Sequence, residues 1–177
     1  MKTCFKLLFL SSLMFFISCS TESVSEDLTT DLTATAAKAK KPRPIKNTYV
    51  GIDRFEGGVL VGADFTGNMS HAGNITGYTT TTSFVFNDEF TGGTQTSDDV
   101  IVAANGDEIY TSSKVTVTFS QESIDDGTFS SGTYTGGFDF VGGNGRFEGA
   151  TGRSEIVDFG VFGNGMAQHK AAGSITY

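Results

Sequence analysis

The chain has 177 residues, carries a formal net charge of −8, and holds 23 glycines, 16 phenylalanines, two prolines and no tryptophan. All the glycines follow residue 50, where 12 of the phenylalanines but only one of the seven leucines also lie. This composition excludes a helical bundle, which needs leucine and alanine at helical spacing. It also excludes intrinsic disorder, because so many aromatic and β-branched residues can bury a core.

Residues 1–18 have the pattern of an export signal. Two lysines accompany an apolar run from Leu7 to Ile17, and the small Ser18 stands at the expected cleavage point. The run is too short to cross a bilayer as a permanent helix, which needs about 20 apolar residues. Cys19 would become the first residue of the mature protein.

The cysteines favour lipid attachment at this position. Of the two in the chain, cleavage removes Cys4, so the mature protein has no second thiol for an internal disulfide. The segment Phe16-Ile17-Ser18-Cys19 resembles the lipobox of bacterial lipoproteins, with Phe in the usual Leu position. The resemblance implies acyl chains such as palmitate on Cys19. Because Ser20 follows instead of Asp, it also implies the outer membrane, on its periplasmic face or at the cell surface. An ordinary secretory signal with an incidental cysteine is the alternative.

Residues 19–47 are predicted to be the lipidated cysteine and a flexible tether, since they are rich in Ser, Thr, Ala and charge without apolar periodicity. Acidic side chains come first and basic ones follow between Lys38 and Lys46. Pro42 and Pro44 stiffen the end of the tether. The basic half could contact anionic lipid or polysaccharide, and a solvated linker is the alternative.

From Thr48 onward, apolar residues recur with a period of two. Val115, Val117 and Phe119 alternate with polar residues, as expected of β-strands. Breaks rich in glycine, asparagine and aspartate separate about eight such segments. The clearest break is Asn105-Gly106, which predicts a type I′ hairpin turn.

We predict that residues 48–177 form one domain, in which the sheet closes on itself. Open sheet edges are commonly protected by proline or charge, and this segment has no proline. Its last residues, Gly173–Tyr177, read as a strand that can pair with Thr48–Asp53. Strand glycines such as Gly77 suit tight curvature. We therefore predict one closed antiparallel β-barrel of about eight strands, with an interior either filled or open to one small ligand. A β-sandwich is the alternative.

Three motifs resemble a family of secreted bacterial proteins. Gly142–Gly152 is similar to the family's G-G-x-G-R-F-x-G-A-T-G signature, Ala103–Asp107 to its A-A-N-G-D turn, and Gly67–Gly73 to its G-x-x-[ST]-H-x-G segment. That family is expected to share the barrel of plant allene oxide cyclases and dirigent proteins. The resemblance implies this fold, a homo-oligomer of two or three chains, and confinement of a hydrophobic molecule inside the barrel. It places no catalytic residue on this chain.

The glycine-rich stretch predicts a structural hairpin instead of a phosphate or calcium site. Glu148 stands where G-x-G-x-x-G needs a third glycine, and Phe147 where a calcium nonapeptide needs Asp. We expect Phe147 to enter the core and Arg146 to bind carbonyls or a carboxylate. The residues with a predicted structural role are Asn105, Gly106, Gly142, Gly143, Gly145, Arg146, Phe147, Gly149 and Gly152.

Few residues are candidates for chemistry. For His71 a structural hydrogen bond is favoured over proton transfer, and it joins Arg54, Asp64 and Tyr78 as the candidates for a catalytic role inside a barrel. Two histidines and one mature cysteine argue against a zinc site, so no metal and no cofactor are predicted. The acidic pair Asp98-Asp99 is assigned to a turn, where it would aid solubility.

The charge balance limits the function further. From Thr48 onward there are 16 acidic and five basic side chains, a net of −11, which argues against nucleic acid as a partner. The leading hypothesis is a lipid-anchored, non-enzymatic barrel at the cell envelope that binds a small apolar or amphipathic molecule or simply contributes to the surface. An isomerase or cyclase acting inside the barrel is one alternative. A surface adhesion or assembly module is another.

Overall fold

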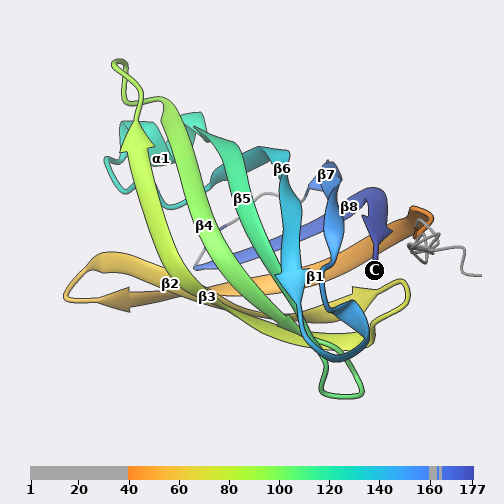
Figure 1. Cartoon of the computed structure of the whole chain (residues 1–177). Helices are drawn as coiled ribbons and strands as arrows, with labels where there is room; N and C mark the ends of the chain where they lie inside the picture. Colours follow the sequence, from red (N-terminus) through yellow and green to blue (C-terminus); the bar gives the residue numbers. More distant parts are fainter. Residues whose placement is uncertain (1–39, 160–162, 164) are drawn as a thin grey trace, which may run out of the picture. The chain divides into compact units, whose positions relative to one another are not determined.

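A computed structural model of the chain describes residues 40–159, 163 and 165–177, and shows one sheet wrapped into a barrel (Figure 1). The predicted export signal, Cys19 and most of the predicted tether lie outside the described residues. The eight strands are β1 (Arg43–Glu56), β2 (Val59–Met69), β3 (Gly73–Phe86), β4 (Gly92–Val102), β5 (Glu108–Phe119), β6 (Gly132–Gly143), β7 (Thr151–Phe159) and β8 (Met166–Thr176). Two short helical segments, α1 (Gln121–Asp125) and η1 (Gly145–Phe147), follow β5 and β6.

The strands pair in chain order, and the last pairs with the first. Every neighbouring pair is antiparallel, and β8 runs beside β1 from Arg43 opposite Ile175 to Ile52 opposite Met166. The predicted closed antiparallel barrel of eight strands is therefore confirmed, and the β-sandwich is excluded. Closure leaves both edges of the sheet paired, which explains how this domain dispenses with edge protection.

The first strand begins before the predicted domain boundary. β1 starts at Arg43, whereas the sequence analysis places residues up to 47 in the tether. Ile45 and Asn47 are each only 2% exposed, so this segment belongs to the barrel core. The boundary was placed too late because a single isoleucine among charged residues shows no alternation of apolar and polar side chains. Pro44 is tolerated near the start of the strand, where few ladder hydrogen bonds are required of it.

Side chains inside the barrel form two apolar clusters. The larger one closes the end that holds η1, and includes Met69, Ile109 and Phe147, none more than 1% exposed. The smaller one centres on Val117 and Phe119, against which Ile124 of α1 packs. The interior is therefore filled at both clusters, with apolar side chains that alternate along the strands.

One local prediction differs from the structure, and one short helix was not predicted. Gly106 has a positive φ of 88°, but Asn105 is not among the residues with positive φ, so the turn is not type I′. Gly106 N–H donates to the Ala103 carbonyl and Ala103 N–H to the Asp107 carbonyl, which is a type I turn followed by a glycine bulge. The short helix α1 was not predicted from the sequence, although Ser120 provides its N-cap by accepting from Ser123 N–H.

Candidate functional site

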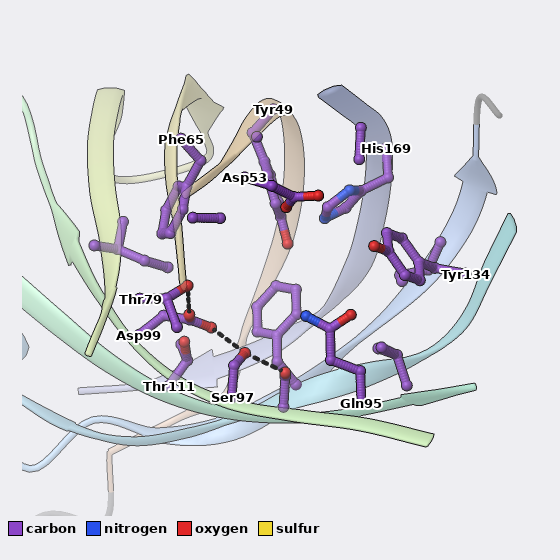
Figure 2. Close-up of a pocket in the computed structure, with 18 residues that line it drawn as sticks. Tyr49, Asp53, Phe65, Thr79, Gln95, Ser97, Asp99, Thr111, Tyr134 and His169 are labelled. Carbon is purple, nitrogen blue, oxygen red and sulfur yellow. Dashed lines mark hydrogen bonds between the residues drawn. The ribbon is translucent and has the colours of Figure 1, made fainter. Parts of the chain in front are cut away.

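The barrel interior is hollow over part of its length. A partly enclosed cavity of about 110 Å³ is lined by residues from all eight strands (Figure 2). Phe65, Ile101 and Phe138 of the larger apolar cluster line it, and so do Val115 and Tyr134 at the smaller cluster. The cavity therefore touches both clusters of the core.

One wall of the cavity carries hydroxyl groups around a carboxylate. Asp99 lies in β4, directly opposite Thr79 of β3 on one side and Thr111 of β5 on the other. Thr79 Oγ1 donates to Asp99 Oδ1 at 2.7 Å, and Ser97 Oγ donates to Asp99 Oδ2 at 3.1 Å (Figure 2). The Ser97 and Ser113 hydroxyls are in turn 2.7 Å apart. Adjacent strands thus build a hydroxyl network that reaches across three strands.

Two opposing effects act on Asp99. Burial raises the pKa of its carboxyl above the ordinary value, and the hydroxyl donors of Thr79 and Ser97 act in the other direction by stabilising the charged form. No lysine or arginine within the described ranges forms an ion pair with Asp99. The carboxylate is thus held by neutral donors and faces an open space.

The opposite wall is aromatic. Tyr49 and His169 come from β1 and β8, and their rings pack edge to face with centroids 3.8 Å apart. The Tyr49 ring is also 5.6 Å from Phe65 and 6.4 Å from Phe138. Figure 2 shows Tyr49 and His169 across the cavity from Asp99 and Ser97. A guest in the cavity would therefore contact both aromatic rings and polar atoms.

Burial perturbs the other titratable groups of the cavity. It raises the pKa of Tyr49, to which the nearby Asp99 charge adds, and lowers the pKa of His169 to about 4. The pKa of Asp53 is raised by burial as well. The pKa of Tyr134 is raised by burial and then by the charge of Asp53. At neutral pH His169 is therefore uncharged, and both tyrosines keep their protons.

The four catalytic candidates from the sequence do not line this cavity. Arg54 Nε lies 3.5 Å from Asp64 Oδ1, with both side chains largely exposed, and Tyr78 is the register partner of Asp64. These three residues are thus brought together on the outer face of the barrel. His71 is separate, in the β2–β3 turn, where its Nε2 donates to the Pro44 carbonyl at 3.0 Å.

The predicted structural motifs meet at the end of the barrel that η1 closes. Asp107 Oδ2 accepts from Asn105 Nδ2 at 2.6 Å and from the Arg146 backbone N–H at 3.2 Å. Phe147 is 1% exposed and packs against Tyr177, with ring centroids 4.8 Å apart. The glycines of the Gly142–Gly152 stretch therefore serve a hairpin that carries η1.

None of the cavity residues was predicted as a site residue, and Asp99 lies in a different kind of element from the predicted turn. Asp98 and Asp99 lie inside β4, not in a turn. Asp98 points outward, where it accepts from Thr81 Oγ1 at 3.0 Å. Asp99 has the same parity as the buried Ile101, and that alternation was the available signal.

Comparison with known proteins adds no assignment. No protein-family model matches the chain, and no curated protein matches it in sequence. In the part of the chain that the structure describes, no group of three or more histidine, cysteine, aspartate or glutamate side chains is arranged to hold a metal ion. No described helix has the length and apolarity needed to span a membrane.

Proposed function

We propose that the barrel binds one small amphipathic molecule in its interior, and that lipid on Cys19 anchors the protein at the outer membrane. The observation that carries the first part is a cavity of about 110 Å³ whose two walls differ in chemistry, hydroxyls and Asp99 facing aromatic rings. An apolar protein cavity of about 150 Å³ is enough to hold benzene. This cavity is smaller but only partly enclosed, so the proposed guest is no larger than one ring with a short polar substituent, part of which extends into the opening.

The cavity has the features of a ligand site instead of a packing defect. Packing defects in protein cores are small and apolar, and they are costly to stability. Here Asp99, Ser97 and Gln95 all face the same space, which is the combination of apolar surface and convergent polar groups typical of small-molecule sites. Binding without chemistry is the primary proposal.

Native mass spectrometry of the full-length protein, extracted from membranes in mild detergent, tests the binding proposal. We expect a bound small molecule in the wild type and its loss in Ala167→Phe, because the larger ring fills the cavity. Thr133→Ala, on the exposed surface of β6, is the matched control. Wild-type protein without a guest under all extraction conditions would refute the proposal, and the same spectra report the number of chains in any homo-oligomer.

The lipid anchor has its own test. We expect radioactive palmitate to label the wild type and not Cys19→Ala, and the variant to leave the membrane fraction. Equal labelling of the two proteins would refute the anchor without touching the binding proposal.

An isomerase or cyclase is the second candidate, favoured by one observation. Asp99 and Tyr49 are titratable groups with perturbed pKa values on opposite sides of one cavity, which is a common feature of catalytic sites. Incubation of the protein with the guest found by mass spectrometry would then give a product of unchanged mass and altered chromatographic retention. Asp99→Asn should abolish this conversion while a guest remains bound.

A further inference from the structure

The charges around the cavity all have one sign. Two carboxylates, Asp53 and Asp99, are among the lining side chains. Among the described residues, no lysine or arginine lines the cavity. His169 adds no positive charge at neutral pH, since burial keeps its imidazole neutral. A guest that carried a carboxylate or phosphate would meet only like charge, in a space where water screens it weakly.

The carboxylate of Asp99 has remaining capacity for hydrogen bonds. An ionised carboxyl group offers about four acceptor sites. Thr79 and Ser97 each occupy one, on different oxygens, and Thr111 supplies a further donor. These hydroxyls hold the carboxylate in position without neutralising it. The missing partner is a positively charged donor.

The aromatic rings that line the cavity suit the same kind of partner. Tyr49 lies within 5.6 Å of Phe65 and 6.4 Å of Phe138, measured between ring centroids, and all three line the cavity. The face of an aromatic ring attracts an ammonium group electrostatically, and more strongly when water is excluded. A carboxylate that shares one cavity with several rings is therefore a combination that favours an organic cation over a neutral molecule of equal size.

We infer that the guest of the barrel is a small primary or secondary ammonium ion bearing an apolar group, with its N–H donors on Asp99 and its carbon skeleton against Tyr49, Phe65 and Phe138. This inference rests on the proposed binding function and specifies its ligand class. Asp53 also lines the cavity, and its carboxylate adds to the negative charge that a cation would meet there.

The test compares three probes with the same ring and different charge: benzylammonium, benzyl alcohol and benzoate. Isothermal titration at pH 7 with the full-length protein in detergent should show benzylammonium binding at least about tenfold more tightly than benzyl alcohol, and no binding of benzoate. This comparison needs only the wild type, so it does not depend on the folding of any variant.

Variants then locate the charge that matters. Asp99→Asn should weaken benzylammonium binding by about tenfold or more and leave the affinity for benzyl alcohol unchanged. Asp98→Asn is the matched control, since it removes the neighbouring carboxylate from the outer face of the same strand and should change neither affinity. Circular dichroism of both variants verifies that the barrel is intact.

The outcomes separate this inference from the proposed function. If benzyl alcohol or benzoate binds as tightly as benzylammonium, the cation assignment is wrong and the binding function stands. If none of the probes binds, the guest found by native mass spectrometry decides the question. A guest without a basic nitrogen overturns the cation assignment, and a guest with a basic nitrogen supports it. If neither probes nor a native guest bind, both proposals fail.

Discussion

The Asp107 side chain accepts a hydrogen bond from the backbone N–H of Arg146 at 3.2 Å, which ties the β4–β5 turn to η1. Asn105 Nδ2 donates to the same oxygen at 2.6 Å. A Cβ atom at Gly145 would collide with the Asp107 carboxylate, so glycine at that position allows the close approach. One carboxylate thus joins two segments that the sequence analysis treated as separate turn motifs.

Replacement of this carboxylate should weaken the closed end of the barrel. Hydrogen bonds from Asn105 and then from the Arg146 N–H hold the pKa of Asp107 below its ordinary value, so the folded state favours the charged form. The resulting stabilisation is present above the unfolded pKa of about 4 and is lost as pH falls through the folded pKa. Asp107→Ala should therefore lower the melting temperature at pH 7, and the difference from wild type should shrink below about pH 4. Asp88→Asn, in the exposed β3–β4 hairpin, is the control, and an undiminished difference at low pH would contradict the assignment.

Two glycines opposite Phe65 should respond differently to alanine. Gly77 and Gly51 are both register partners of Phe65, on its two sides. A Cβ at Gly77 would collide with the Phe65 ring and come within 2.6 Å of the Val100 carbonyl oxygen, whereas a Cβ at Gly51 would lie 4.0 Å from Phe65 Cβ. We expect Gly77→Ala to cost about 2 kcal/mol in the free energy of unfolding and Gly51→Ala about 0.5 kcal/mol or less, measured by urea titration. Equal losses would show that the Phe65 ring does not depend on the glycine beneath it.

Buried His169 should make the barrel sensitive to mild acid. Burial lowers its pKa to about 4, while an unfolded histidine has a pKa of about 6.5, so between these values the unfolded state binds the extra proton. Stability then falls as pH falls from about 6.5 to about 4, by about 3 kcal/mol from this residue. The loss of unfolding free energy between pH 7 and pH 4 should be smaller in His169→Gln by that amount.

The carboxyl of Asp99 should change stability with pH in the opposite direction to His169. Its pKa is raised, so the folded state takes up its proton first and gains relative stability as pH falls. The two residues therefore act in opposite directions, and Asp99→Asn should enlarge the acid-induced loss that His169→Gln reduces. A proton NMR titration that finds the His169 pKa near its unfolded value would contradict the expectation for His169. An acid-induced loss in Asp99→Asn no larger than in the wild type would contradict the expectation for Asp99.

Asn47 should contribute little to stability despite its burial. It is 2% exposed, and within the described part of the chain neither its Oδ1 nor its Nδ2 has a hydrogen-bond partner. Burial of this amide without hydrogen bonds costs free energy, and an apolar side chain of similar volume would remove that cost. Asn47→Leu should therefore raise the free energy of unfolding by about 1 kcal/mol. Thr79→Val, which removes a donor bonded to Asp99, should lower the free energy of unfolding by a similar amount. A destabilised Asn47→Leu would show that water satisfies the amide inside the barrel.

Local chemistry was sufficient to predict the class of fold. Alternation such as that of Val115, Val117 and Phe119 depends only on the two-residue repeat of a strand, which any sheet imposes. The boundary at Thr48 and the turn at Asn105-Gly106 were wrong in detail because both depend on the partner strand. Ile45 became a core residue only through its pairing with Gly173 of β8.

The sequence by itself determined that this chain forms strands with turns between them, because strand periodicity and turn chemistry act over a few residues. It did not determine which phenylalanines enter the core: Phe65 and Phe147 are buried, whereas Phe55 and Phe90 are more than half exposed. Tertiary structure alone decided which side chains face one another inside the barrel. Tyr49 and Asp99 lie on strands far apart in the chain, and Thr79 meets Asp99 only because of a register shift between Thr79 and Thr81. A shift of one residue turns every side chain of a strand to its other face, and the bulges that set register here leave no periodic trace in the sequence.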